Sequence, residues 1–191
     1  MKKSYTTNLY VALTHYPVVN KNGDVIASAV TNLDLHDISR VAKTYGVRLF
    51  FVVTPLEDQQ TLVEKLVSHW VTGFGSSYNP KRREAMELVR IKNSLDEVID
   101  DIRQNGGKTP KTVVTSAKRG SRNISFGKFR EMLSSGNPYV LIFGTGWGLA
   151  QNFVVEADYV LDPVTGSTDY NHLSVRSAAA IILDRLFGTY T

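Results

Sequence analysis

Two kinds of hydrophobic pattern alternate along this chain. Short apolar runs rich in Val, Ile, Phe and Tyr, with no polar alternation, are separated by segments whose apolar residues recur every third or fourth position. The first pattern is typical of strands buried on both faces, and the second of helices that pack on a sheet. The alternation therefore predicts an α/β domain with a mostly parallel sheet flanked by helices. Strands are predicted at residues 9–13, 48–53, 88–91, 112–115, 139–143 and 159–161.

Polar and small residues mark the ends of the predicted helices. Ser94 and Glu97 stand at capping-box spacing before an apolar stripe that ends at Gly106-Gly107, so a helix is predicted between them. Asn79-Pro80 predicts the start of a short basic helix. The residues predicted to cap helices are Asn32 or Asp34, Asn79, Ser94 and Asn171.

The last predicted helix, from about residue 173 to residue 187, is apolar almost all round. Since a helix without a polar face is normally buried, we expect it to be covered on more than one side, in part by another subunit. No linker, low-complexity stretch or internal repeat appears, so residues 1–191 are predicted to form a single domain. The longest apolar runs, at 139–143 and 178–183, are far shorter than the roughly 20 residues of a bilayer-spanning helix. The N-terminus also lacks the apolar stretch of a secretory signal, so we expect a cytoplasmic protein with no membrane segment.

The composition narrows the possible chemistry. The chain has no cysteine, which excludes a thiol nucleophile, a cysteine zinc site, an iron–sulfur cluster and disulfides. Its 4 histidines are not at metal-ligand spacing from one another, so we predict no metal site. The formal net charge of +4 permits a polyanionic partner without establishing one.

The most informative candidate site follows the predicted strand at 139–143. Gly144-Thr145-Gly146-Trp147-Gly148 comes directly after it. Ligands of open α/β sheets bind at strand ends, and glycines let the backbone approach a ligand closely. Free amides of such a turn can hold an adenine edge, a carboxylate or a phosphate. The G-x-G-x-G spacing and the late position disfavour the dinucleotide-binding motif of an oxidoreductase.

Two other segments combine polar side chains with the start of a helix. Residues 170–176 form a polar loop and the first turn of the final predicted helix. Residues 32–46 follow the first strand, and there Asp37 and Arg40 share one side of a predicted helix at i, i+3 spacing. Because it follows the first strand, this helix can approach the loops at 144–150 and 170–176.

These three segments, in this order and over almost the whole chain, resemble the SPOUT superfamily of S-adenosylmethionine-dependent RNA methyltransferases, in particular its small stand-alone bacterial members. The matching motifs are N-L-D-x-H-D-I-x-R…T-Y-G at 32–46, G-T-G-W-G-L-A at 144–150 and Y-N-H-L-S-V-R-S-A-A-A at 170–180. The resemblance implies a C-terminal trefoil knot whose loops hold the methyl donor, S-adenosylmethionine. It also implies a homodimer with the final helix at or near the interface.

The resemblance also implies roles for individual residues. Arg40 stands six residues before Gly46, the spacing of the arginine that acts on the acceptor hydroxyl in ribose-methylating relatives. Those relatives have a second asparagine where this chain has Asp34, His36 and Asp37. Asp37 or His36 as the base, and a ring nitrogen as the acceptor, therefore stay open beside the ribose 2′-oxygen. The catalytic candidates are Arg40, Asp37 and His36, and the implied donor-binding residues are Gly144, Thr145, Gly146, Trp147, Gly148, Leu161, Asn171, Leu173 and Ser174.

RNA would be held through its phosphates by basic residues on the short helix and in the loop at 116–125. These candidates are Lys81, Arg82, Arg83, Lys118, Arg119 and Arg122. His15 and Tyr16, just after the first strand, are candidates to stack on a splayed base. The sequence thus predicts an S-adenosylmethionine-dependent RNA methyltransferase that acts on tRNA or rRNA as a homodimer. The alternative is a non-catalytic nucleotide- or RNA-binding regulator or assembly factor of the same fold.

Overall fold

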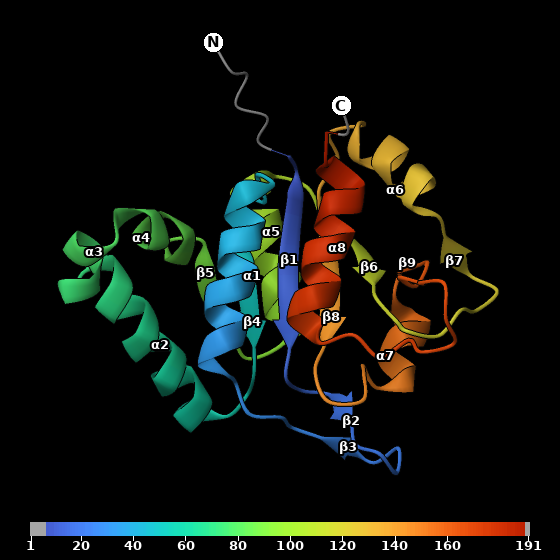
Figure 1. Ribbon diagram of the computed structural model, residues 1–191, viewed down its shortest axis with the longest axis horizontal. Helices are drawn as coiled ribbons and strands as arrows, with labels where there is room; N and C mark the ends of the chain where they lie inside the picture. The colour runs from blue at the N-terminus through green and yellow to red at the C-terminus, as the bar shows by residue number, and fades with distance from the viewer. Residues whose placement is uncertain (1–6, 190–191) are drawn as a thin grey trace.

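The computed structural model describes residues 7–189. Within them a parallel seven-stranded sheet forms the centre of the molecule, in the order β5-β4-β1-β8-β6-β9-β7 (Figure 1). A separate hairpin pairs β2 (Val18–Val19) with β3 (Val25–Ile26). The strands of the large sheet are β1 (Leu9–Thr14), β4 (Phe50–Val53), β5 (Val89–Lys92), β6 (Lys111–Val114), β7 (Asn123–Ile124), β8 (Tyr139–Gly144) and β9 (Tyr159–Leu161).

Helices cover both faces of this sheet. Buried side chains of α1, α2, α4, α6 and α8 form one apolar core with the first face, and those of α5 form a second core with the other. Partly buried residues of α7 pack against the second core. Figure 1 shows α1 and α8 side by side in front of the central strands, with α5 behind them. The helices are α1 (Asn32–Thr44), α2 (Glu57–Val71), α3 (Phe74–Tyr78), α4 (Pro80–Met86), α5 (Leu95–Gly106), α6 (Phe126–Leu133), α7 (Gln151–Glu156) and α8 (Val175–Phe187).

The central strand β1 shows why the apolar runs lack polar alternation. Leu9, Val11 and Leu13 point into the core under α1 and α8, whereas Tyr10 and Ala12 point into the core under α5. Both faces are covered, so every position must be apolar. Each predicted strand is present with ends shifted by no more than two residues, and the predicted parallel α/β class is confirmed. The strands β2, β3 and β7 were not predicted, because two residues carry no detectable period.

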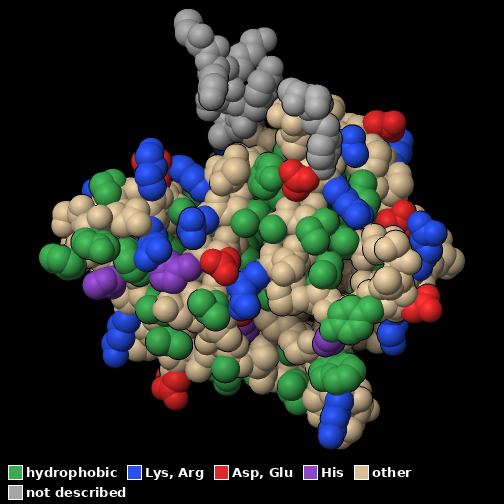
Figure 2. Space-filling view, in the orientation of Figure 1, with side chains coloured by type: hydrophobic (Ala, Val, Ile, Leu, Met, Phe, Trp, Pro, Cys, Tyr) green, Lys and Arg blue, Asp and Glu red, His purple; other side chains and the backbone are tan. Residues whose placement is uncertain are grey.

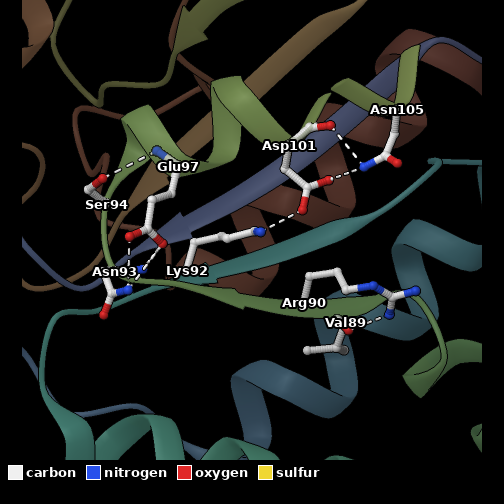
Figure 3. A network of polar contacts seen from close by, with 8 residues as sticks. All are labelled: Val89, Arg90, Lys92, Asn93, Ser94, Glu97, Asp101 and Asn105. Atoms are coloured by element: carbon white, nitrogen blue, oxygen red, sulfur yellow. Dashed lines mark hydrogen bonds and ion pairs between the residues drawn. The ribbon is translucent and has the colours of Figure 1, made fainter. Parts of the chain in front are cut away.

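The start of α5 follows the predicted capping pattern with one difference (Figure 3). The Ser94 hydroxyl accepts a hydrogen bond from the Glu97 amide at 3.3 Å. The Glu97 carboxylate accepts from the Asn93 amide at 3.0 Å, one residue before the cap, instead of from Ser94 itself. The hydrogen bonds from the backbone and the side chain of Asn93 lower the pKa of the Glu97 carboxyl. Gly107 ends the helix in a left-handed conformation at φ +71°, as the glycine pair predicted.

Besides Ser94, one further predicted cap is confirmed and two are wrong. Asn79 caps α4 as predicted, by accepting from the Arg82 amide. The cap of α1 is Thr31, which precedes both predicted residues, and the cap of α8 is Ser174. Several neighbouring polar residues can each serve as a cap, so the local sequence did not choose among them.

The direction of the strands places the loops of interest together. Because β1, β8, β6 and β9 are parallel, the segments that follow them leave the sheet at the same edge, at the lower side of Figure 1. We call this the carboxyl edge. The N-terminal ends of α1 and α8 lie at this edge as well. Within residues 7–189, no helix combines the length and apolar character needed to cross a bilayer.

Candidate donor-binding and catalytic site

β8 runs into a loop at residues 144–150, here called the glycine loop, whose backbone requires glycine. A Cβ atom on Gly144 would lie 2.7 Å from the Leu149 backbone nitrogen, because the loop folds back over the end of its strand. Gly146 and Gly148 have φ angles of +61° and +111°, where other residues are strained. A Cβ on Gly148 would meet nothing within 4 Å. The loop therefore bends tightly and leaves open space beside its last glycine.

The glycine loop is held in place by β1 and by the β2–β3 hairpin. The Thr145 amide donates to the Thr14 carbonyl at 3.2 Å, and the Trp147 amide donates to the Val19 carbonyl at 3.0 Å. The Gly148 amide closes a turn on the Thr145 carbonyl at 3.1 Å. The sequence suggested that the amides of this loop are free to bind a ligand, but these three bind protein carbonyls. The hairpin that engages them was not predicted.

A partly buried chain of polar side chains supports the same loop. The Thr145 hydroxyl donates to the Thr14 carbonyl at 3.2 Å and also contacts the Ser28 hydroxyl. Since the Thr145 proton is used, Ser28 donates to Thr145 and in turn accepts from His15, whose Nδ1 is 3.1 Å away. This order of donors puts the proton of His15 on Nδ1. Its Nε2 is buried and has no hydrogen-bond partner among the described residues.

His15 is a neutral core residue. It has 0% exposure, and burial lowers its pKa from 6.5 to about 4, although the charge of Asp34 acts in the opposite direction. The prediction that His15 stacks on a base is therefore wrong for this side chain, because a buried ring cannot reach a ligand. Tyr16, the next residue, is 44% exposed.

The loops after β6, β8 and β9 meet at the carboxyl edge. The Asn171 amide group donates to the Ala117 carbonyl at 2.8 Å, which joins the loop before α8 to the loop after β6. The His172 ring lies 6.1 Å from the Trp147 ring and 6.5 Å from the Tyr170 ring, measured between centroids. Trp147, Tyr170 and Leu173 are 66%, 75% and 43% exposed. These side chains form an apolar, open surface beside the glycine loop.

Most of the predicted donor-binding residues therefore lie at the carboxyl edge, and some of them have structural roles there. Leu161 is buried at the end of β9, and its carbonyl accepts from the Asn123 amide group at 2.9 Å. Asn171 fixes a loop and Ser174 caps α8, so these three residues shape the surface. Aromatic faces and open backbone at Gly148 match the adenine ring and the sulfonium group of S-adenosylmethionine, and the residues present fit that donor.

The loop at residues 162–174 is here called the donor loop, after its predicted role. Arg176, on the first turn of α8, ties the end of this loop to α1. Its Nη1 donates to Asp34 Oδ1 at 3.0 Å, and its Nε lies 3.4 Å from Asp37 Oδ2. Asp34 is 5% exposed and also accepts from the Thr31 hydroxyl at 2.7 Å. A guanidinium fork can bind two carboxylates at once, which a lysine cannot do with the same geometry. Sequence reasoning did not give Arg176 a role, because its partner Asp34 lies 142 positions away.

The three catalytic candidates point to different neighbours of α1. Asp37 faces α8 and pairs with Arg176, not with Arg40. His36 faces the other way, edge-on to the Trp70 ring at 5.3 Å between centroids. Burial, followed by the positive charge of Arg82, lowers the pKa of His36. The imidazole is therefore neutral at pH 7 and able to accept a proton, while Arg40 is exposed on the same helix.

The basic residues of α4 are engaged within the protein. Lys81 and Arg83 form exposed ion pairs with Glu84 and Glu87 at 2.8 and 2.9 Å. The Arg82 guanidinium lies over the Trp70 ring, 4.5 Å from its centroid. Ion pairs between exposed side chains are weak and exchange easily for other partners.

The second basic group lies in the loop before β7. Since β5 and β7 are the two outermost strands of the sheet, this group and the cations of α4 lie at opposite lateral edges. Arg119 binds Asp162 through two nitrogens, at 3.3 and 3.1 Å. Arg122 donates to the carbonyls of Val155 and Val154 at the end of α7. Lys118 is exposed. The two predicted RNA-binding groups therefore do not form one patch on this chain.

A hollow of about 260 Å³ lies beside the donor loops, lined in part by Arg119, Asp162 and Arg185. The Arg185 guanidinium covers the Phe126 ring there, 5.1 Å from its centroid. Among residues 7–189, no three His, Asp or Glu side chains converge as metal ligands would.

We expect Gly144→Ala to distort the glycine loop, since the new methyl group would press on the backbone nitrogen of Leu149. Such crowding costs about 1–3 kcal/mol of the free energy of unfolding. Chemical denaturation and calorimetric titration with S-adenosylhomocysteine should both show a loss. Gly127→Ala is the control, because its Cβ would meet only Ser125 Oγ at 3.8 Å. A Gly144→Ala variant with unchanged stability and affinity would contradict this account.

We also expect His15 to make the protein less stable in acid. The unfolded chain takes up a proton near pH 6.5 and the folded chain only near pH 4, so the free energy of unfolding falls as the pH drops between these values. From pH 7 to pH 5 the loss should be about 2 kcal/mol. His15→Gln should lack this pH dependence, whereas replacement of the exposed His69 should retain it. Identical pH profiles for His15→Gln and the unmodified protein would refute the buried neutral state.

Comparisons with known proteins agree with the geometry. The sequence model of a family described as SAM-dependent RNA methyltransferase matches residues 8–188. A protein of Oleidesulfovibrio alaskensis named tRNA (guanine-N(1)-)-methyltransferase is 46% identical over 181 residues, which cover 95% of this chain and 42% of that protein. An Aquifex aeolicus protein with the name "Uncharacterized protein" is 39% identical over 181 residues, which cover 94% of this chain and 88% of that protein.

A solved structure shares the fold. The SpoU methyltransferase AviRb from Streptomyces viridochromogenes, in complex with AdoMet, matches with a TM-score of 0.56 and 19% identity over 95% of this chain and 57% of that chain. This chain spans only 42% of the length of the Oleidesulfovibrio protein, so the activity in that name belongs to a longer protein. The family match spans nearly the whole chain and confirms the resemblance of the three motifs. This chain belongs to the family of S-adenosylmethionine-dependent RNA methyltransferases and shares its fold with the SpoU methyltransferase AviRb.

Proposed function

We propose that this chain transfers a methyl group from S-adenosylmethionine to tRNA. The observation that carries the proposal is the position of Arg176, which follows the donor loop directly and binds Asp34 and Asp37 of α1. This contact places the proposed donor-binding loops next to the helix that bears the catalytic candidates. The printed name of the Oleidesulfovibrio relative supports tRNA as the substrate class.

The donor surface suits a cationic cofactor that loses its charge during transfer. S-adenosylmethionine supplies a methyl group bound to a positively charged sulfur. A surface of aromatic rings and backbone carbonyls holds such a group without a fixed negative charge that would favour the reactant over the transition state. Trp147 and Tyr170 offer the rings, and the glycine loop offers backbone close to them.

On the acceptor side, α1 carries two candidate bases. Asp37 lies on the side that faces α8, and His36 lies on the side that faces Trp70. The acceptor is a ribose 2′-oxygen or a ring nitrogen, and its proton must pass to a base as the new bond to the methyl carbon forms. Asp37, held by Arg176, and neutral His36 are the two candidates for this proton. A guanidinium group donates hydrogen bonds and accepts none, so the role of Arg40 is to position a phosphate or to stabilise negative charge on the acceptor.

The active form in this proposal is a homodimer joined through α1 and α8. Leu33 of α1 is 59% exposed, and Leu173, in the loop just before α8, is 43% exposed. Val41, Ala178 and Ile181 are only partly buried. Figure 2 shows hydrophobic side chains gathered over α1 and α8 at the centre of this face. A second copy packed there would cover the exposed apolar area and bring both donor sites near the dimer seam.

The remaining parts of the proposal concern the chain path and the RNA. The resemblance to SPOUT proteins implies that the C-terminal segment is threaded as a trefoil knot, and the hydrogen bond from Asn171 to Ala117 is compatible with such a crossing. A tRNA is an extended polyanion, so it can contact both the α4 cations and the Lys118–Arg122 loop although they lie at opposite edges. A substrate of this length can therefore bind both groups of cations without a single continuous basic patch.

We expect the purified protein to bind S-adenosylmethionine and S-adenosylhomocysteine in calorimetric titrations, with ATP and NAD as negative controls, and to sediment as a dimer. Radioactive methyl groups should then pass to bulk tRNA. Arg40→Ala should lower this transfer at least about a hundredfold, as expected for loss of one catalytic group, without changing donor affinity.

Arg103→Ala is the matched control, because Arg103 is an exposed arginine of α5 paired with Asp100 on the other face of the sheet. Unchanged transfer by Arg40→Ala would remove Arg40 from the catalytic residues. If a well-folded dimer bound neither donor nor product, the methyltransferase proposal would fail and a non-catalytic RNA-binding role would replace it.

A further inference from the structure

The Trp70 side chain joins four helices at the β5 side of the sheet. The rings of Trp70 and of His36 from α1 meet at right angles, with their centroids 5.3 Å apart. The Arg82 guanidinium of α4 lies over the Trp70 ring, 4.5 Å from its centroid. On α3, a Cβ atom at Gly75 would lie only 2.6 Å from a carbon of the Trp70 ring. The short helix α3 therefore packs directly on the indole and depends on glycine at this contact.

The outer side of α3 presents two aromatic rings to solvent. Phe74 and Tyr78 are 75% and 74% exposed, and their rings are stacked with centroids 6.1 Å apart and an interplanar angle of 23°. They lie four positions apart, on the same side of the helix. Since large exposed apolar groups that lie together mark interaction sites, this pair needs a partner. The tight packing of Gly75 means that the rings are carried by a fixed support.

Exposed cations lie on α4, the next helix along the chain, which contacts α3. α4 begins two residues after Tyr78, and the side chains of Lys81 and Arg83 are 87% and 50% exposed. Their carboxylate partners, Glu84 and Glu87, form exposed ion pairs that an RNA phosphate can replace at little cost. Figure 2 shows Lys, Arg and His side chains gathered over this end of the molecule.

Aromatic faces beside exposed cations are suited to single-stranded nucleic acid. Unpaired bases stack on aromatic rings, and the flanking phosphates bind Lys and Arg. A second copy of this chain is a poorer occupant, because protein interfaces are depleted in lysine at their centres. The apolar face over α1 and α8 is also better suited to such a copy.

We propose that Phe74 and Tyr78 form a stacking platform for an unpaired base of the RNA substrate, whose flanking phosphates are bound by Lys81 and Arg83 of α4. This inference rests on the proposed function for the identity of the RNA. The helix that carries the platform packs on Trp70, whose ring also contacts His36 of α1.

The test measures the affinity for a short fluorescein-labelled oligoadenylate RNA by fluorescence anisotropy, with an RNA duplex of the same length for comparison. The double variant Phe74→Ala/Tyr78→Ala should bind the single strand about tenfold more weakly, because a stacked base is lost. Its affinity for S-adenosylhomocysteine, its melting temperature and its binding of the duplex should change little. Phe74→Tyr and Tyr78→Phe keep the rings and should bind normally.

Leu56→Ala is the matched control, since Leu56 is a 44% exposed apolar residue at the other end of α2. The platform is refuted if the double variant is folded and binds the single strand as tightly as the unmodified protein. It is also refuted if the double variant turns from dimer to monomer on sedimentation, which would assign the rings to a second copy. Continued methyl transfer by the unmodified protein in either case would show that only this inference had failed, whereas absence of all RNA binding and transfer would overturn the proposed function too.

Discussion

The parallel pairing of β1 with β8 is the constraint on which the site depends. These strands run in register and end level with each other at Thr14 and Gly144. The Thr14 carbonyl can therefore accept hydrogen bonds from both the amide and the hydroxyl of Thr145, which fixes the start of the glycine loop. With β6 and β9 in the same direction, the loops after these strands are gathered at one edge. Without that shared direction, the motifs would lie at opposite ends of the sheet.

Helix α1 connects the two halves of the proposed reaction. One side carries Asp34 and Asp37, which Arg176 ties to the start of α8 directly after the donor loop. The other side carries His36, which packs against Trp70 and so contacts the region of α3 and α4. A shift of α1 would therefore alter both the donor side and the side proposed to face RNA. Such coupling suits an enzyme that must align two substrates before a direct transfer.

Much of the polar chemistry at the carboxyl edge serves to hold loops in position. His15, Ser28 and Thr145 form a partly buried chain that ends on the Thr14 carbonyl, and the low pKa of His15 keeps this chain uncharged at neutral pH. The three loop amides bound to protein carbonyls add to this rigidity. Aromatic side chains and backbone are left to meet a ligand, and a fixed surface of this kind orients a ligand without having to be reorganised.

The sequence by itself determined the parallel sheet, its longer strands, both ends of α5, the start of α4 and the glycine loop. These features depend on hydrophobic period and on contacts between residues a few positions apart, such as Ser94 with Glu97. Only the tertiary structure decided that His15 is buried, that Asp37 pairs with Arg176, that the two basic groups lie at opposite edges and that Phe74 and Tyr78 are exposed together. Each of these depends on how distant elements pack. Arg176 and Asp34 are 142 positions apart, and a linear pattern carries no signal for a contact between side chains so far separated.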